Sequence, residues 1–355
     1  MNTRKTLAYF HLRDDGKRRF GEERPGMYGR DATRHISVSL SEYGKTVSMK
    51  KESFTSFHSN RSDKKNRSLL YDHIMKTAIL FIFMFRMFTV SAQAETPYPE
   101  LVREDVYKTV DTVRLKITVY YPETVENKAY PALVFFFGGG WNGGNIKQFE
   151  QHSEYFAERG MICVLVDYRV RSRHGTTPFT SLEDAKSAIR FLRANAGKFH
   201  IDPDKIVASG GSAGGHLAAA TAVIEKYNDE NDDLNVNARP NALILFNPVI
   251  DNGPGGYGYE RIGEEYIYFS PLHNLRAGAP PTVFFLGTND GLIPVETAQY
   301  YRKVMERTGS RCDLHLYEGQ GHGFFNVAKS AENFRKTIEQ ADEFLISIGF
   351  LSPSR

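Results

Sequence analysis

A glycine-flanked serine is the strongest chemical signal in the sequence. Ser212 lies in residues 210–214 (GGSAG), between the apolar segment IVAS and the helix-forming segment HLAAATAV. This pattern is typical of a sharp strand-to-helix turn that lifts a serine hydroxyl above a sheet edge, and small neighbours let that turn form. A phosphate-binding turn would instead require G-x-G-x-x-G. The sequence therefore predicts a nucleophilic Ser212, with the backbone N–H of Ala213 facing a developing oxyanion.

A nucleophilic serine needs a general base that a third group orients, and after such a turn the acid precedes the histidine in the chain. Asp290 follows the apolar segment PTVFFLG, in the loop TNDG. His322 follows the segment RCDLHLYEG, in the glycine-flanked loop GQGHGF. We predict that His322 is the general base and that Asp290 orients its imidazole.

Other residues compete for these roles. Asp251 also follows an apolar strand-like segment, NPVI, and is the rival for the acid. His216 comes only four residues after Ser212 on the same predicted helix, which favours a role in supporting the turn. His273 and His315 lack a glycine loop at the end of a strand.

The elements that must position these residues alternate along the chain. A period-2 pattern from Tyr107 predicts two strands joined by a turn at Asp111 and Thr112, and continuous apolar runs predict buried strands. Those runs fall in residues 131–137, 161–169, 205–208, 241–250, 281–287 and 311–319, and the predicted helices cover 146–160, 181–196, 216–226, 297–309 and 331–349. Ser181 is expected to open the second helix. The alternation predicts an α/β protein with a mostly parallel, doubly wound sheet, helices on both faces and one domain over 95–355.

Several short motifs occur in the order of a known family. They are residues 137–141 (FGGGW), 166–169 (VDYR), 182–185 (LEDA), 211–217 (GSAGGHL), 270–272 (SPL), 287–290 (GTND) and 321–324 (GHGF). From about 107 to 349 the chain resembles α/β-hydrolase esterases of the hormone-sensitive-lipase and acetyl-esterase group. It is most similar to the bacterial carbohydrate-esterase branch, which includes feruloyl and acetyl-xylan esterases. The resemblance implies the α/β-hydrolase fold. We expect only a minimal cap, because residues 95–106 before the first predicted strand are too few for an N-terminal helical cap of the lipase kind. No cofactor or metal is expected.

The resemblance also implies that the N–H groups of Gly139 and Gly140 join that of Ala213 in an oxyanion hole. The family usually begins this loop with histidine, but the chain has Phe137. A phenyl ring cannot hold the loop by a hydrogen bond. A looser loop would forfeit part of the ~2.7–4 kcal/mol that one oxyanion donor typically contributes.

The segment 251–269 is the best candidate for a substrate roof, because it is rich in tyrosine (257, 259, 266 and 268). Tyrosine faces suit sugars or a feruloyl ring, although the same rings could simply pack the segment onto its own domain. Trp141, Tyr257 and Tyr259 are the predicted substrate contacts. We expect a serine carboxylic-ester hydrolase that removes acetyl or feruloyl groups from carbohydrate, so its partner is a small-molecule ester or an acylated polysaccharide.

Three alternatives remain open. Residues 138–141 (GGGW) also suit an arylformamidase-like amide hydrolase. A short-chain lipase or esterase without carbohydrate preference is the second. A catalytically inactive binding protein of the same fold is the third, and labelling of Ser212 by a fluorophosphonate would exclude it. The sequence does not specify the oligomeric state.

Charge and cysteine content exclude other classes. Residues 1–94 hold 18 of the 45 Lys and Arg but 9 of the 42 Asp and Glu, so the remainder is acidic and nucleic-acid binding is not expected. Cys163 and Cys312 lie in apolar runs, which predicts buried free thiols. The acidic stretch 227–233 (YNDENDD) lacks the glycine and spacing of a calcium loop, so we expect a solvated loop.

The N-terminal residues have a different character. Residues 1–74 are polar and basic without periodicity, which predicts a disordered extension or an upstream start. Residues 75–94 combine Lys76, an apolar run interrupted by Arg86, and the small-x-small site AQA, so we predict a signal peptide cleaved before Glu95. The run is too short for stable membrane insertion, and the expected location is secreted or periplasmic. A buried core helix and a basic cytoplasmic extension are the alternatives.

Overall fold

The computed structural model describes residues 101–353, in which the chain forms a single eight-stranded sheet with the order β1-β2-β4-β3-β5-β6-β7-β8. The predicted extension over 1–74 and the predicted signal peptide over 75–94 lie outside the described residues. The sheet is mostly parallel, as the alternation of elements predicted. Its crossover connections carry helices to both faces, so the α/β-hydrolase fold is confirmed.

One edge of the sheet is antiparallel. β1 (Val102–Val110) and β2 (Val113–Tyr120) form a hairpin whose turn places Asp111 at φ 52°. β2 then pairs antiparallel with β4 (Ile162–Val166). The parallel strands are β3 (Tyr130–Phe136), β4, β5 (Ile201–Gly211), β6 (Ala242–Phe246), β7 (Thr282–Gly287) and β8 (Cys312–Tyr317).

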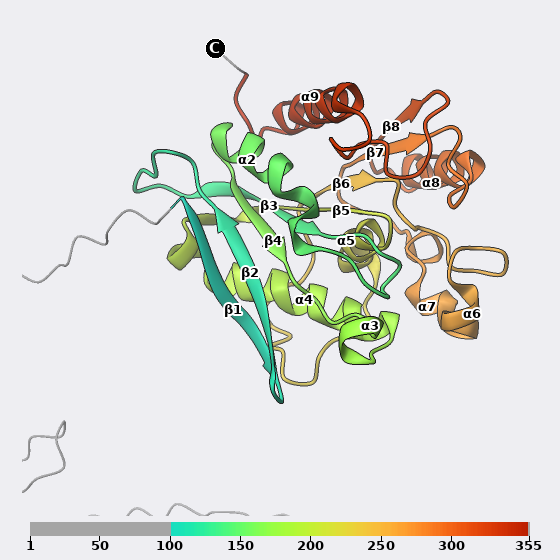
Figure 1. Ribbon diagram of the computed structural model, residues 1–355, viewed down its shortest axis with the longest axis horizontal. Coiled ribbons are helices and arrows are strands. Elements are labelled where there is room, and N and C mark those ends of the chain that lie inside the picture. Colours follow the sequence, from blue (N-terminus) through green and yellow to red (C-terminus); the bar gives the residue numbers. More distant parts are fainter. Residues whose placement is uncertain (1–100, 354–355) are drawn as a thin grey trace, which may run out of the picture. The chain divides into compact units, whose positions relative to one another are not determined.

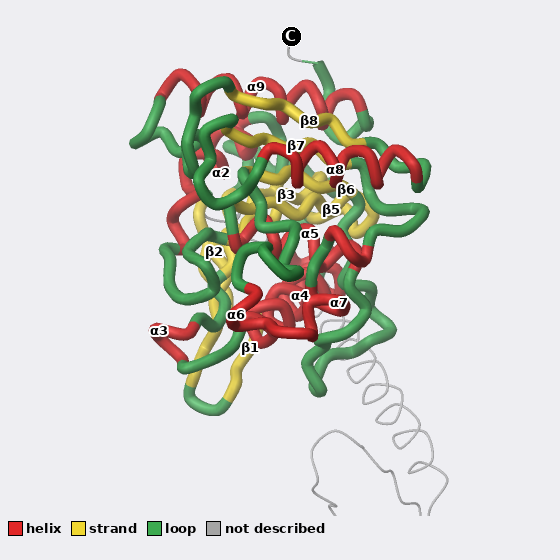
Figure 2. Tube along the Cα trace, turned by 90° about the vertical axis from the view of Figure 1, so that its right-hand side faces the viewer, coloured by secondary structure: helices red, strands yellow, loops and turns green. Residues whose placement is uncertain are grey.

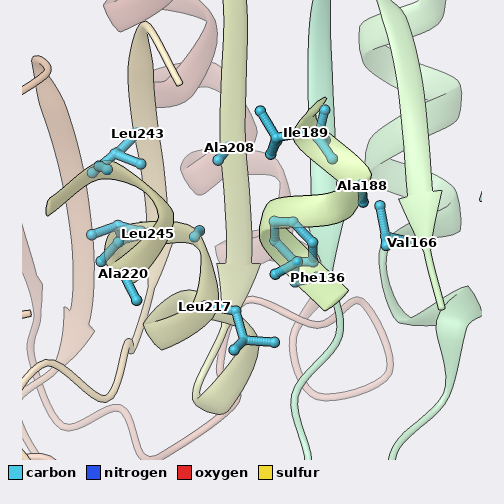
Figure 3. Packing of buried hydrophobic residues seen from close by; sticks show 14 of the residues in the cluster. Phe136, Val166, Ala188, Ile189, Ala208, Leu217, Ala220, Leu243 and Leu245 are labelled. Carbon is cyan, nitrogen blue, oxygen red and sulfur yellow. The ribbon is translucent and has the colours of Figure 1, made fainter. Parts of the chain in front are cut away.

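Helices cover the sheet on both faces (Figure 1). The sheet separates the hydrophobic core into two clusters, one on each face. α2 (Glu150–Glu158) and α9 (Ala331–Ser347) cover one face. α4 (Pro178–Ala194), α5 (Ala213–Val223) and α8 (Val295–Arg307) cover the other. Figure 3 shows this second core, in which α4 and α5 bury side chains such as Ile189 and Leu217 against the strands. Because both faces are covered, the central strands read as continuous apolar runs.

α4 begins three residues earlier than the sequence predicted. It starts at Pro178, which stands at the first helical position, after Thr177 in an extended conformation. Proline suits that position because the N–H it lacks would have no partner within the helix. Ser181 is therefore not a cap, and its hydroxyl donates instead to the carbonyl of Arg169 at 2.7 Å.

The acidic stretch 227–233 is not simply solvated, which corrects the sequence-based expectation. Asp229 pairs with Lys108 at 2.7 Å and Asp232 pairs with Arg190 at 2.7 Å, and all four side chains are at least 87% buried. The stretch packs against α4 and the β1–β2 hairpin, where these cations compensate the buried carboxylates. Both cysteines are free and buried, as predicted.

The parallel strands end on one side of the sheet, and the loops that could carry chemistry gather there. Figure 2, turned toward this side, shows α6 (Tyr259–Ile262) and α7 (Tyr266–Phe269) among those loops. The other short elements are η1 (Ile146–Phe149), α3 (Arg171–His174), η2 (Ala196–Phe199), η3 (Gly263–Glu265) and η4 (Leu272–Asn274). Among residues 101–353, none of the helices combines the length and apolar character that a membrane crossing requires.

Candidate active site

Ser212 stands at a strained turn between β5 and α5. Its backbone has φ 54° and ψ −118°, a conformation that a non-glycine residue adopts only where the surroundings hold it. A Cβ on Gly214 would lie 2.0 Å from the carbonyl oxygen of Phe136, and one on Gly210 would lie 2.5 Å from Gly214. Only glycine fits at these two positions, which explains why small residues flank the serine. The turn leaves Ser212 partly exposed at the end of the strand.

Asp290 and His322 meet directly. His322 Nδ1 lies 2.8 Å from Asp290 Oδ2, and the aspartate side chain is fully buried while the histidine side chain is 25% exposed. Burial raises the pKa of Asp290, but hydrogen bonds from His322 and from the backbone N–H of Leu292 and Ile293 outweigh it and lower the pKa below its usual value. The carboxylate is thus ionised at neutral pH and can orient the imidazole.

The loops that carry these two residues are tied together. The Asn289 N–H donates to the carbonyl of Gln320 at 2.9 Å, and the Gly319 N–H donates to the hydroxyl of Thr288 at 2.8 Å. A Cβ on Gly287 would lie 2.1 Å from the Gln320 oxygen, so the loops approach too closely for any other residue. The ends of β7 and β8 therefore fix the acid and the base relative to each other.

The residues that compete for the roles of acid and base contact other partners. Asp251 Oδ1 accepts from the Gly253 N–H at 2.9 Å and lies 3.8 Å from His273 Nδ1, so its histidine neighbour is not His322. His216 is fully buried, with Nε2 3.0 Å from the carbonyl of Phe269, and burial lowers its pKa to about 3. His315 stacks on Phe285 within the sheet.

Asn247 touches the imidazole, a contact that sequence reasoning missed. Its Nδ2 lies 3.1 Å from Nδ1 and 2.9 Å from Nε2 of His322. An atom in the ring plane at these distances from both nitrogens would overlap Cε1, so the amide lies over the ring face, as in an N–H···π contact. Asn247 is 1% exposed and has φ 33°. The amide thereby supports the plane of the ring and leaves the in-plane lone pair of Nε2 open.

Ser212 joins this group through its backbone. Its N–H donates to the carbonyl of Phe246 at 3.0 Å, directly before Asn247. Within residues 101–353 its hydroxyl makes no hydrogen bond to His322. Such contacts in active sites are often long before substrate binds. The structure thus brings Asp290 and His322 together and places Ser212 at the same sheet edge.

The glycine loop after β3 has the backbone that a close turn requires. Gly139, Gly140 and Trp141 all have positive φ, at 129°, 62° and 56°. A Cβ on Gly139 would lie 2.3 Å from the carbonyl oxygen of Gly143. The Gly139 carbonyl accepts from Asn142 and Gly143 at 3.0 and 3.2 Å. Among the described residues, none of the backbone hydrogen bonds made by the loops has the N–H group of Gly139, Gly140 or Ala213 as its donor.

The loop is anchored despite the phenylalanine at position 137. Phe137 is 1% exposed and stacks on Tyr168, with ring centroids 4.1 Å apart. The Tyr168 hydroxyl donates to the Phe137 carbonyl at 2.6 Å. The Gly138 N–H donates to Gln148 Oε1 at 2.6 Å, and Gln148 in turn donates to Asn326 at 3.2 Å. These contacts hold the loop without a histidine at position 137.

The predicted substrate contacts do not share one environment. Trp141 is 1% exposed and packs edge-on against His216 at 5.0 Å, so its ring belongs to the core beneath the loop and not to an open surface. The tryptophan is buried because the insert, residues 251–269, folds over it. Tyr257 is half-buried, with its hydroxyl close to Gly140, and Tyr259 bonds through its hydroxyl to Glu264 at 2.6 Å.

The insert also supplies a charged contact that sequence reasoning missed. Arg261 Nη1 donates to the carbonyl of Gly140 at 2.6 Å, across 121 positions of sequence. The signal was a lone arginine among tyrosines in residues 257–268, which gave no reason to connect it with the glycine loop. Residues 101–353 contain no group of His, Cys, Asp and Glu side chains arranged to hold a metal ion.

Comparisons with known proteins identify the family of the chain. The BD-FAE family model matches residues 117–254, and the dienelactone hydrolase family model matches residues 266–347. Apo esterase 2 of Thermogutta terrifontis has 45% sequence identity and a TM-score of 0.69, covering 72% of this chain and 98% of that chain. The chain belongs to the α/β-hydrolase esterases.

The curated relatives of this chain have lower sequence identity to it. The acetylxylan esterase of Xylanibacter ruminicola is 28% identical over 264 residues, which is 69% of this chain and 50% of that protein. Esterase LipC of Mycobacterium tuberculosis is 30% identical over 230 residues, which is 59% of this chain and 56% of that protein. The chain spans about half the length of the curated relatives it matches. Thermogutta esterase 2 has been solved phosphorylated by paraoxon, with propionate bound and with butyrate bound.

Proposed function

We propose that the protein is a serine carboxylic-ester hydrolase in which Ser212 is the nucleophile, His322 the general base and Asp290 the orienting acid. The observation that carries this proposal is the 2.8 Å contact between His322 Nδ1 and the buried Asp290 carboxylate, at the same sheet edge as the strained Ser212 turn. An ionised aspartate on Nδ1 keeps the proton there, so Nε2 can accept the serine proton.

The reaction would proceed in two halves. Ser212 Oγ attacks the ester carbonyl as its proton passes to His322 Nε2, and the resulting oxyanion would accept from the N–H groups of Ala213, Gly139 and Gly140. Collapse of this intermediate breaks the bond to the alcohol, which takes the proton from His322. Water then repeats the sequence on the acyl-enzyme, releasing the carboxylic acid and restoring the serine.

The finer proposal is that the substrate is an acetyl or other short acyl ester displayed on carbohydrate. The acetylxylan esterase relative supports the carbohydrate part, and the propionate and butyrate bound to Thermogutta esterase 2 support a short acyl group. Tyr257 and Tyr259 of the insert are the proposed sugar contacts, because tyrosine offers an apolar face with a polar tip. The buried Trp141 is left out of that set.

We also propose that the protein is secreted or periplasmic. The support is the sequence of residues 75–94, with a basic start, an apolar stretch and the site AQA before Glu95. An acylated polysaccharide outside the cell is consistent with this location.

The test combines active-site labelling with a substrate panel. The full chain is treated with paraoxon, and mass spectrometry should find one diethylphosphoryl group on Ser212, as expected for a relative of an esterase that paraoxon phosphorylates. The same protein is then assayed on acetylated xylan, methyl ferulate, nitrophenyl esters and N-formylkynurenine. Faster turnover of acetylated xylan supports the proposal. Preference for N-formylkynurenine would replace it with an amide hydrolase, and equal turnover of all nitrophenyl esters without activity on xylan would remove the carbohydrate part.

A further inference from the structure

We propose that Arg261 is a positioning residue for the oxyanion loop, so that the insert helps to build the site and does not merely cover it. This inference rests on the proposed function. The starting observation is the hydrogen bond from Arg261 Nη1 to the carbonyl of Gly140, at 2.6 Å. Hydrogen bonds from a charged donor are shorter and stronger than neutral ones.

The guanidinium is held in place by aromatic faces. Its central carbon lies 5.3 Å from the ring centroid of Trp141 and 5.5 Å from that of Tyr257. Cation–π contacts of this kind favour one orientation of the planar group. The Arg261 side chain is 25% exposed, and its only ion pair within residues 101–353 is to Glu260, which is 72% exposed. The aromatic pair and the loop carbonyl therefore determine its position more than that surface pair does.

The loop needs such a restraint because its backbone is permissive. Gly139 and Gly140 are glycines at positive φ, where many conformations compete. The Gly140 N–H belongs to the peptide group whose carbonyl is that of Gly139. This carbonyl accepts hydrogen bonds from the N–H groups of Asn142 and Gly143. The following peptide has its carbonyl, that of Gly140, bonded to Arg261. Arg261 thus completes the set of bonds that hold both peptide planes next to the Gly140 N–H.

Packing of the insert reinforces this bond. A Cβ on Gly140 would lie 2.8 Å from the Tyr257 hydroxyl, so the tyrosine leaves no space for a side chain at that position. Arg261 and Tyr257 together press the loop from the insert side. Because a preorganised donor stabilises charge that develops only in the transition state, loss of this restraint should lower kcat more than it raises KM.

The experiment compares Arg261→Met with a matched control in the same insert, using nitrophenyl acetate and the full chain. Lys226 pairs with Glu265 of the insert and lies 4.6 Å from the Tyr268 ring centroid, so Lys226→Met removes a cation that holds the insert from its other side. We expect Arg261→Met to lower kcat by about 10-fold to 100-fold, a loss no greater than that caused by removing a whole oxyanion donor. KM should stay within about threefold of the wild-type value. Lys226→Met should keep wild-type kcat.

A transition-state analogue supplies the second readout. Affinity for a boronic acid that adds to Ser212 should fall in Arg261→Met by the same factor as kcat/KM, since both report the stabilised oxyanion. Affinity for the product acetate should stay the same. An unchanged kcat, a rise in KM alone, or an equal loss in Lys226→Met would overturn the proposal. Melting temperatures within a few degrees of wild type exclude misfolding as the cause. A wild-type protein that neither turns over esters nor reacts with paraoxon would instead overturn the proposed function itself.

Discussion

At the scale of residues, the site depends on a carboxylate that stays ionised while buried. Burial raises the pKa of Asp290, but the His322 contact and the hydrogen bonds from the backbone N–H groups of Leu292 and Ile293 lower it by more. The net pKa is therefore below the usual value. A depressed pKa contributes stability that is present above the unfolded value, about 3.9, and is lost as the pH falls through the folded value. Loss of activity in mild acid should therefore not arise from protonation of Asp290.

The first residue-scale prediction concerns the nucleophile. Ser212→Ala should lower kcat by about 10⁶-fold, because removal of a triad nucleophile leaves only binding and the oxyanion hole. The fold should survive, since Ser212 is partly exposed and its backbone N–H keeps its bond to Phe246. Steady-state kinetics and circular dichroism check both statements. Residual activity above about a hundredth of wild type would place the nucleophile elsewhere.

The second residue-scale prediction separates the two candidate acids. Asp290→Asn should lower kcat by about 10⁴-fold, because an amide on Nδ1 favours the wrong imidazole tautomer. Asp251→Asn is the matched control: its carboxylate lies near His273 and the Gly253 N–H, so its effect on kcat should be small. The same ester assay measures both variants. The opposite ranking would assign the acid to Asp251.

At the scale of elements, α2 docks onto the sheet through a histidine that is held neutral. His152 is 2% exposed, and rings of Phe149 and Phe334 lie 5.0 and 4.8 Å from its own. Burial lowers its pKa to about 3. In the unfolded chain the pKa returns to about 6.5. Between these values the unfolded chain binds one proton that the folded chain does not, so the free energy of unfolding decreases as the pH falls.

The element-scale prediction follows from this linkage. His152→Phe should reduce the slope of unfolding free energy against pH, between about pH 6 and pH 4, by about 1.4 kcal/mol per pH unit, the value for one proton. Phenylalanine suits the surrounding aromatic side chains, so the native packing of α2 should persist. Urea titrations of both proteins at several pH values give the slopes. An unchanged slope would mean that His152 binds a proton in the folded protein as readily as in the unfolded chain.

At the scale of the whole molecule, charge is divided unevenly along the chain. Residues 1–94 contain twice as many basic as acidic side chains, 18 against 9, whereas the whole chain has a net charge of only +3. Removal of that segment would leave an acidic enzyme. An acidic net charge keeps a protein soluble and disfavours nonspecific binding to polyanions such as nucleic acid.

The molecule-scale prediction is that the mature protein begins at Glu95. A signal peptidase would cut after Ala94 of the AQA site, at the end of a segment that starts with Met75. Intact-mass measurement of protein recovered from the envelope or medium of the native host gives the answer. A species that retains residues 1–74 would overturn both the start at Met75 and the export, and it would reopen the amide-hydrolase alternative. The roles proposed for Ser212, Asp290 and His322 would not depend on that outcome.

Short-range patterns were enough to predict much of the protein. The run before Ser212 and the glycines around it predict the strained turn, because local sterics alone demand small residues there. Continuous apolar runs predict the central strands, because burial on both faces excludes polar side chains. Even so, the predicted start of α4 was three residues too late, because Pro178 at the first helical position begins the helix before Ser181.

Only the tertiary structure decided which side chains meet. Asp251 and Asp290 both follow strands, and it is the pairing of β7 with β8 that puts Asp290 on His322. Arg261 reaches Gly140 across 121 positions because the insert after β6 folds back over the loop after β3, and the same fold buries Trp141. Such contacts depend on strand order and on the path of an irregular segment, which hydrophobic periodicity does not encode.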